Sequence, residues 1–183
     1  MARWENTRST WGLPAKIFHW LSALLVLFLT AHGWWMTHMV ARAGRMTQYQ
    51  LHAEIGYYLL FLLALRMLWR AANPVPDMPA ELPRWERTTA HAAHWVLYAL
   101  MLGVSISGWM LAGTFSQPIG ETLFGVIDVP QLVEGRAWHR VLEETHEVLS
   151  YVLLALVIVH IASALRHHWI RKNDVLRRMM LRD

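Results

Sequence analysis

The sequence contains no cysteine among its 183 residues. This absence excludes disulfide bonds, iron–sulfur clusters and haem held by a thiolate, so any redox centre has to use other ligands. Charge is also sparse, because Asp, Glu, Lys and Arg make up only 16% of the chain. Hydrophobic residues make up 55%, and the mean hydropathy is +0.25. The composition is too apolar for an ordinary soluble domain and predicts a membrane protein.

Long intervals without charged residues indicate where the chain crosses the membrane. A spanning helix needs about 20 mainly apolar residues, with polar ends that reach the interface. Four intervals meet this condition, near residues 15–38, 50–70, 90–113 and 143–166. The first is longer than the apolar region of a cleaved signal peptide, which runs for about 7–15 residues, and we interpret it as a retained helix. We therefore expect residues 1–183 to form a single domain, an all-α transmembrane bundle of up-down-up-down topology.

The segments between these intervals have the composition of loops. Pro74, Pro76, Pro79 and Pro83 exclude regular helix and predict a cytoplasmic loop over residues 71–88. Residues 114–140 form the expected outer loop, whose apolar side chains would suit packing over the outer mouth of the bundle. The tail, 167–183, is basic, and we expect it to rest on the anionic inner leaflet.

The distribution of Lys and Arg predicts the orientation. If the N-terminus is cytoplasmic, 13 of the 17 Lys and Arg residues lie inside, and only Arg42, Arg45, Arg136 and Arg140 lie outside. The positive-inside rule then puts both termini in the cytoplasm. The net charge of +4 is explained by topology, so no nucleic-acid partner is needed.

Two histidines bracket the last apolar interval. His146 and His160 are fourteen residues apart, which leaves them about 40° apart around a helix and about 21 Å apart along it. They therefore project from one face at opposite sides of the membrane. This geometry suits two haems stacked across the bilayer, each needing one more axial imidazole from another helix.

Depth limits which histidines could supply the second ligands. At the inner depth the candidate is His19, although His91 and His94 compete for the same level. At the outer depth the candidates are His52 and His32. Because His19 and His32 lie about 140° apart around one helix, a single face cannot easily serve both haems, which favours His52. We interpret His32, His38 and His139 as interfacial polar residues.

Several motifs together resemble the bacterial cytochrome b561 family. They are FHW at 18–20, LHAEIG at 51–56, LRMLWR at 65–70, AHAAHWVLYAL at 90–100, THEVLSYVLLALVIVHIASALRHH at 145–168 and VLRRMM at 175–180. The resemblance implies two haem b groups with bis-histidine ligation, the inner one held by His19 and His160 and the outer one by His52 and His146. It leaves His91 and His94 open between haem-edge hydrogen bonding and helix packing. The chain departs from the family near Ser105, where a proline is common.

Haem iron whose axial sites are both filled by histidine cannot bind oxygen, so electron transfer is the expected task. The resemblance implies either a superoxide:ubiquinone oxidoreductase or an electron-carrying subunit of a dehydrogenase or hydrogenase. In the first case a superoxide anion would be drawn to the outer arginines. His167, two turns past His160, is a candidate contact for ubiquinone.

Other interpretations of these residues stay open. Arg66 lies fourteen residues after His52 and would pair with an inner haem propionate, or would only mark the cytoplasmic edge as a snorkelling arginine. Eleven histidines could instead serve a metal-binding or metal-transporting membrane protein, although the apolar middles of the spans argue against a transport site there. A membrane anchor for a larger redox enzyme is a further alternative.

Overall fold

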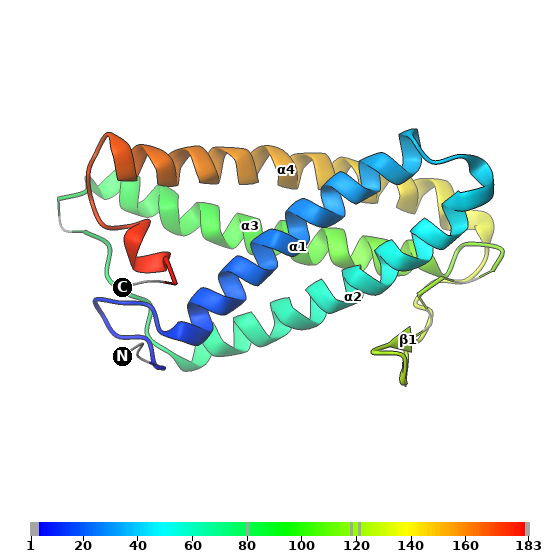
Figure 1. Cartoon of the computed structure of the whole chain (residues 1–183), viewed down its shortest axis with the longest axis horizontal. Coiled ribbons are helices and arrows are strands. Elements are labelled where there is room, and N and C mark those ends of the chain that lie inside the picture. Colours follow the sequence, from blue (N-terminus) through cyan, green and yellow to red (C-terminus); the bar gives the residue numbers. More distant parts are fainter. Residues whose placement is uncertain (1–3, 80, 118, 121, 182–183) are drawn as a thin grey trace.

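The computed structural model describes residues 4–79, 81–117, 119–120 and 122–181, and within them the chain forms four long α-helices joined by loops (Figure 1). The helices are α1 (Leu13–His38), α2 (Arg42–Ala72), α3 (Arg84–Ala112) and α4 (His139–Trp169). The shorter elements are β1 (Thr122–Leu123), β2 (Ile127–Asp128), η1 (Arg136–Trp138) and η2 (Arg177–Met179). The all-α, four-helix architecture predicted from the sequence is confirmed in this part of the chain.

Prolines help to fix where the helices begin. Pro14 lies in the first turn of α1, where a missing N–H costs nothing, and Pro83 stands directly before α3. α2 begins at Arg42 although its span was expected from residue 50, and α3 begins at Arg84, inside the segment expected to be a loop. The difference arises because hydropathy detects only the part of a helix that lies in hydrocarbon, whereas backbone hydrogen bonding continues through polar turns outside it.

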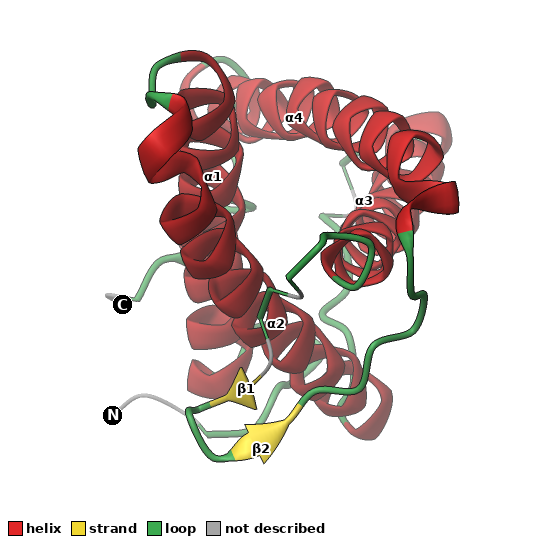
Figure 2. Cartoon of the chain, turned by 90° about the vertical axis from the view of Figure 1, so that its right-hand side faces the viewer, coloured by secondary structure: helices red, strands yellow, loops and turns green. Residues whose placement is uncertain are grey.

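The helices pack in chain order around a common axis. α1 packs against α2, α2 against α3, and α3 against α4, whereas α1 and α4 touch each other far less (Figure 2). Both ends of the chain lie at the same end of the bundle, which we call the termini end (Figure 1). The opposite end, with the segment between α3 and α4, is the loop end.

The packed core lies midway along the bundle and is apolar. It consists of Val26, Leu29, Leu59, Leu63, Tyr98, Met101 and Leu153. The outer surface is also apolar, and Leu24, Leu68 and Val159 are 62–67% exposed. All of α1 to α4 are long and apolar enough to cross a membrane. Since water would not solvate such a surface favourably, the exposed residues face lipid.

The apolar side chains between α3 and α4 were expected to pack over the mouth of the bundle, and only some of them do. Phe115 does pack inward, with its ring centroid 4.8 Å from that of His139. The strands β1 and β2, however, lie against the outside of α2 (Figure 2). Gly120, at a positive φ of 65°, allows this path, because a Cβ there would lie 2.7 Å from the ring of Tyr57.

The C-terminal tail folds back across the termini end of the bundle (Figure 1). Arg171 donates to Glu86 at 2.6 Å, and the indole of Trp20 donates to the Met179 carbonyl at 2.8 Å. Glu86 is only 8% exposed. A buried carboxylate needs a partner of opposite charge, which explains why the basic tail is held here.

Candidate functional site

The helices bring histidines together at both ends of the bundle. At the termini end His19 of α1 and His160 of α4 face each other, with ring centroids 6.3 Å apart. At the loop end His52 of α2 and His146 of α4 are 6.1 Å apart. These are the two pairs that the family resemblance implied. In each pair α4 provides one ring and a different helix provides the other.

The spacing of the rings fits an iron atom between them. A metal–nitrogen bond of roughly 2 Å, plus about 1 Å from the nitrogen to the ring centre, puts two opposed imidazoles roughly 6 Å apart. Both pairs have this separation. The Nδ1 atom of His52 is buried and has no hydrogen-bond partner among the described residues. The residues at both ends therefore fit bis-histidine haem ligation.

His146 has a defined orientation. Its Nδ1 lies 2.9 Å from the Val104 carbonyl oxygen and 3.2 Å from Ser107 Oγ. Because a carbonyl only accepts, Nδ1 carries the proton and Nε2 keeps the lone pair that a metal needs. A second partner that fixes the tautomer of a ligand histidine is usual in metal sites.

Glycines allow the loop-end rings to lie close to neighbouring helices. A Cβ on Gly108 of α3 would lie 2.8 Å from Cε1 of His146, closer than real Cβ atoms approach. A Cβ on Gly33 of α1 would lie 3.4 Å from Cε1 of His52. One turn of α3 thus holds the His146 ring through the Val104 carbonyl, the Ser107 hydroxyl, which also donates to that carbonyl, and Gly108. Sequence reasoning missed this turn because neither a carbonyl nor a glycine gives a charge or hydropathy signal.

Arg66 lies beside the termini-end pair. Its Nη2 donates to Nδ1 of His19 at 3.0 Å, and its guanidinium lies 5.0 Å from the centre of the Tyr98 ring. The side chain is half-buried. Arg66 therefore reaches inward toward the His19 and His160 rings, which a purely snorkelling arginine would not do.

The other histidines of α3 differ from each other. His94 has its ring centroid 5.5 Å from that of His160 and donates from Nδ1 to the Ala90 carbonyl at 2.6 Å, which leaves Nε2 as an acceptor. His91 is exposed. His94 is therefore part of the termini-end cluster, and His91 is not.

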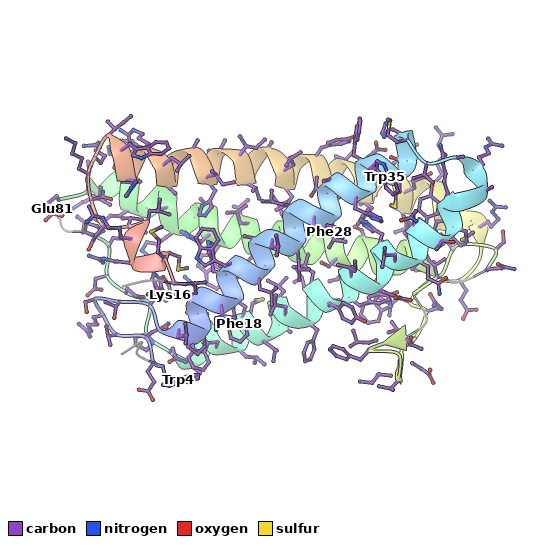
Figure 3. The ribbon with its side chains drawn as sticks, in the orientation of Figure 1. Trp4, Lys16, Phe18, Phe28, Trp35 and Glu81 are labelled. Atoms are coloured by element: carbon purple, nitrogen blue, oxygen red, sulfur yellow. The ribbon has the colours of Figure 1, made fainter. Side chains whose placement is uncertain are left out.

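His32 is half-buried at the loop end, between α1 and α2. Its Nε2 contacts Gln48 Oε1 at 3.1 Å, and its ring lies nearly parallel to that of His52, with centroids 5.7 Å apart. Phe28 and Trp35, both labelled on α1 in Figure 3, flank it at centroid distances of 5.5 and 5.7 Å. The short link between α1 and α2 explains this position, because it brings the end of α1 against the start of α2.

The two remaining candidates for interfacial histidines lie near helix ends. His38 is exposed in the last turn of α1, and its Nδ1 bonds to the Trp34 carbonyl at 2.8 Å. His139 opens α4, and its Nδ1 lies 2.7 Å from the hydroxyl of Thr114. Both rings therefore have local hydrogen-bond partners away from the two pairs.

His167 takes part in the turn that follows α4. Asn173 donates from Nδ2 to Nδ1 of His167 at 2.9 Å, and the Asn173 N–H donates to the His167 carbonyl. Nδ1 of the neighbouring His168 is buried without a hydrogen-bond partner among the described residues. His167 therefore has a structural role in closing the helix, and only Nε2 remains for another partner.

The four arginines expected outside are all at the loop end, near the start of α2 or of α4. Arg140 pairs with Glu144 at 2.8 Å, and Arg45 donates to the Val40 carbonyl. Arg42 and Arg136 are exposed. Across the described part of the chain, no three His, Asp or Glu side chains converge to hold a metal ion directly. A haem iron differs from such a site, because it needs only two protein ligands.

Comparisons with known proteins give the same family over nearly the whole chain. A sequence model of the family described as prokaryotic cytochrome b561 matches residues 10–181. The chain is 34% identical to cytochrome b561 homolog 2 of Escherichia coli strain K12 over 177 residues, 96% of this chain and 93% of that protein. It is 27% identical to the probable superoxide oxidase CybB of Yersinia pestis over 175 residues, 88% of this chain and 90% of that one. It is 24% identical to cytochrome b561 homolog 1 of E. coli over 172 residues, 90% and 93% of the two chains.

The matched region contains α1 to α4 and every histidine discussed above. The apolar outer surface and the opposed histidine pairs are what such a protein requires. The chain therefore belongs to the prokaryotic cytochrome b561 family: it is a bacterial multi-pass inner-membrane protein of electron transfer that binds b-type haem.

Proposed function

We propose that this chain holds two haems b, one at each end of the bundle, and transfers electrons from superoxide outside to ubiquinone. Two superoxide anions each give up one electron and become dioxygen, and ubiquinone takes up the two electrons with two protons. The observation that carries the proposal is the presence of two opposed histidine pairs, with ring centroids 6.3 and 6.1 Å apart, at opposite ends of one bundle.

The side chains have separate tasks in this proposal. Bound haem b supplies one-electron redox chemistry. His19 with His160, and His52 with His146, would hold the two iron atoms, so the bound groups would carry electrons and not oxygen. The apolar core between the pairs excludes water and keeps the rings at a fixed separation. The Val104 carbonyl holds His146 in the tautomer that presents Nε2.

The direction of transfer follows from the charge distribution. We propose that both termini are cytoplasmic, because 13 of the 17 Lys and Arg residues then lie inside. The loop end would face the periplasm, where Arg42 and Arg136 are exposed and would attract an anion. The probable superoxide oxidase among the relatives is 27% identical, which supports this substrate weakly.

At the termini end we propose that Arg66 binds a haem propionate and that His167 contacts ubiquinone. An arginine only donates, so Nδ1 of His19 accepts from Arg66 and Nε2 of His19 carries its proton in this arrangement. Iron binding through Nε2 requires Arg66 to move from Nδ1, which frees the guanidinium for a carboxylate. His167 retains Nε2 for a quinone oxygen.

A second candidate function is that of an electron-transfer subunit serving a partner dehydrogenase or hydrogenase. The tail held over the termini end by Glu86 and Arg171 favours it to some degree, because it gives that end a folded surface on which a partner could dock. The two functions differ in whether the chain alone reduces quinone.

The ligand assignment predicts a specific pattern of haem loss. His160→Leu and His52→Leu should each lower the haem content of the purified protein from two per chain to one, because each removes an axial ligand. The controls His94→Leu and His32→Leu remove the neighbouring ring and should leave two. Haem is quantified by a pyridine haemochrome assay against protein concentration. If a control variant loses haem and the corresponding ligand variant does not, the neighbouring histidine is the ligand instead.

Gly108→Ala should disturb only the loop-end haem. The added methyl group would lie 2.8 Å from Cε1 of His146, so the ring has to tilt or withdraw. The low-spin ferric EPR signal of that haem should shift while the signal of the other haem stays unchanged. Gly103→Ala on the same helix is the control, since its Cβ would be 3.7 Å from Leu149. Identical spectra for the two variants would contradict the close approach.

Arg66→Gln should lower the midpoint potential of the termini-end haem, because it removes a cation that favours the reduced state. A shift of roughly 30–60 mV is expected, since a tenfold change in a one-electron equilibrium is about 59 mV. Arg70→Gln is the control. Its guanidinium also lies near the Tyr98 ring, at 5.7 Å, but the hydrogen bond to His19 comes from Arg66. A redox titration that gives equal shifts for both variants would remove the propionate assignment.

The purified protein should reduce a soluble ubiquinone analogue when superoxide is supplied, without any partner. The rate should fall as salt is added, because the screening length shrinks from about 10 Å at 0.1 M ionic strength to about 3 Å at 1 M. Quinone reduction is followed by absorbance with superoxide dismutase as the blank. If the chain is inactive alone but active with a reduced dehydrogenase, the subunit alternative holds instead.

The same assay tests the quinone contact. His167→Leu should raise the KM for quinone several-fold with unchanged haem spectra. Asn173→Ala removes the bond to Nδ1 of His167 but keeps the ring, so it separates the structural role from the binding role. An equal rise in KM in both variants would assign His167 to helix closure only.

A further inference from the structure

A short apolar hairpin lies on the outside of the bundle at the loop end. β1 and β2 pair antiparallel, with Thr122 opposite Asp128 and Leu123 opposite Ile127. The turn between them is tight, since Phe124 and Gly125 both have positive φ and the Val126 N–H donates to the Leu123 carbonyl. The side chains near the tip are apolar and exposed. They are Phe124 at 54%, Val126 at 80% and Ile127 at 54%.

The hairpin is fixed along α2 and does not project away from the protein. Gly120 packs against Ala53 and Tyr57, and Phe124 contacts the rings of Tyr58 and Phe61 at centroid distances of 5.2 and 5.8 Å. From Ala53 to Phe61 is about 12 Å along a helix. The tip is therefore held about two turns further toward the termini end than His52.

The surface that the tip joins is the lipid-facing side of α2. Phe61, Leu65 and Leu68 recur at helical spacing and are 36–67% exposed. Phe61 contacts Phe124, and Leu65 and Leu68 follow Phe61 along the same side of α2. The hydrocarbon that covers these residues would therefore also cover the tip. The base of the hairpin is polar, with Asp128 exposed on β2. An apolar tip and a polar base are typical of an element that enters a bilayer from one side.

The backbone of the hairpin is suited to that position. Unpaired N–H and C=O groups are very costly in hydrocarbon, so irregular segments are excluded from lipid unless their polar groups are satisfied internally. Here the strand pairing and the turn bond between Val126 and Leu123 provide internal partners close to the tip.

We propose that residues 123–127 form a membrane wedge, which inserts into the bilayer leaflet at the loop end and contacts lipid acyl chains beside α2. Lipid is favoured over a protein partner because the wedge continues an established lipid-facing surface. The wedge does not depend on the proposed electron-transfer function. It would hold the loop-end histidine pair at a fixed depth relative to the membrane surface.

The absence of cysteine makes the wedge directly testable. Val126→Cys in the full-length protein is labelled with a nitroxide and reconstituted in nanodiscs of phosphatidylethanolamine and phosphatidylglycerol. Collisional relaxation by oxygen, which concentrates in hydrocarbon, is compared with that by a water-soluble nickel chelate. The matched control is Glu134→Cys, an exposed polar position of the same loop.

The wedge predicts that the oxygen-to-nickel ratio is at least several-fold higher at position 126 than at position 134. Equal ratios would put the hairpin in water and overturn the proposal. Low accessibility to both reagents at position 126 would also overturn it, because the tip would then be covered by a second copy or by another protein.

Discussion

Two histidines on different helices have to meet at the same depth before an iron atom can be held between them, and this bundle meets that condition twice. α4 provides one ring at each end. α1 and α2 are antiparallel and joined by a three-residue link, so their first turns reach opposite ends of the bundle. One therefore supplies His19 and the other His52. The chain order of the helices follows from this need as much as from the packing of their apolar faces.

The membrane divides the packing into two kinds. Inside the bundle, Leu63 and Leu153 are 1% and 3% exposed and contact other helices. Outside, residues of the same chemistry face lipid, so hydropathy alone cannot tell the two apart. The residues that decide which face turns inward are polar ones: the histidines, Arg66, and the hydroxyl of Ser107 beside His146. Their burial is costly in lipid and gives each helix its rotation about its own axis.

The helical period explains how much could be predicted from sequence. The four apolar intervals and the fourteen-residue spacing of His146 and His160 reflect the rise and the 3.6-residue turn of an α-helix, so both can be found in the sequence. Each interval corresponds to one of the four helices of the described chain. The contact of His32 with Gln48 could not be predicted, because it depends on how the link turns α2 back against α1. The grip of α3 on His146 uses a carbonyl and a glycine, which have no distinctive pattern. The path of the hairpin and the return of the tail to Glu86 are long-range contacts that no local signal indicates.

The straight run of α4 between its two histidines behaves as a ruler of fixed length. Inserting or deleting one residue between them would rotate one ring about 100° relative to the other and move it about 1.5 Å in depth. Neither α1 nor α2 could correct such an error without breaking its own contacts at that end. Among descendants of this chain, the lipid-facing residues between His146 and His160 can exchange for other apolar residues, and Leu153 is restricted by its packing, but the number of residues has to stay the same.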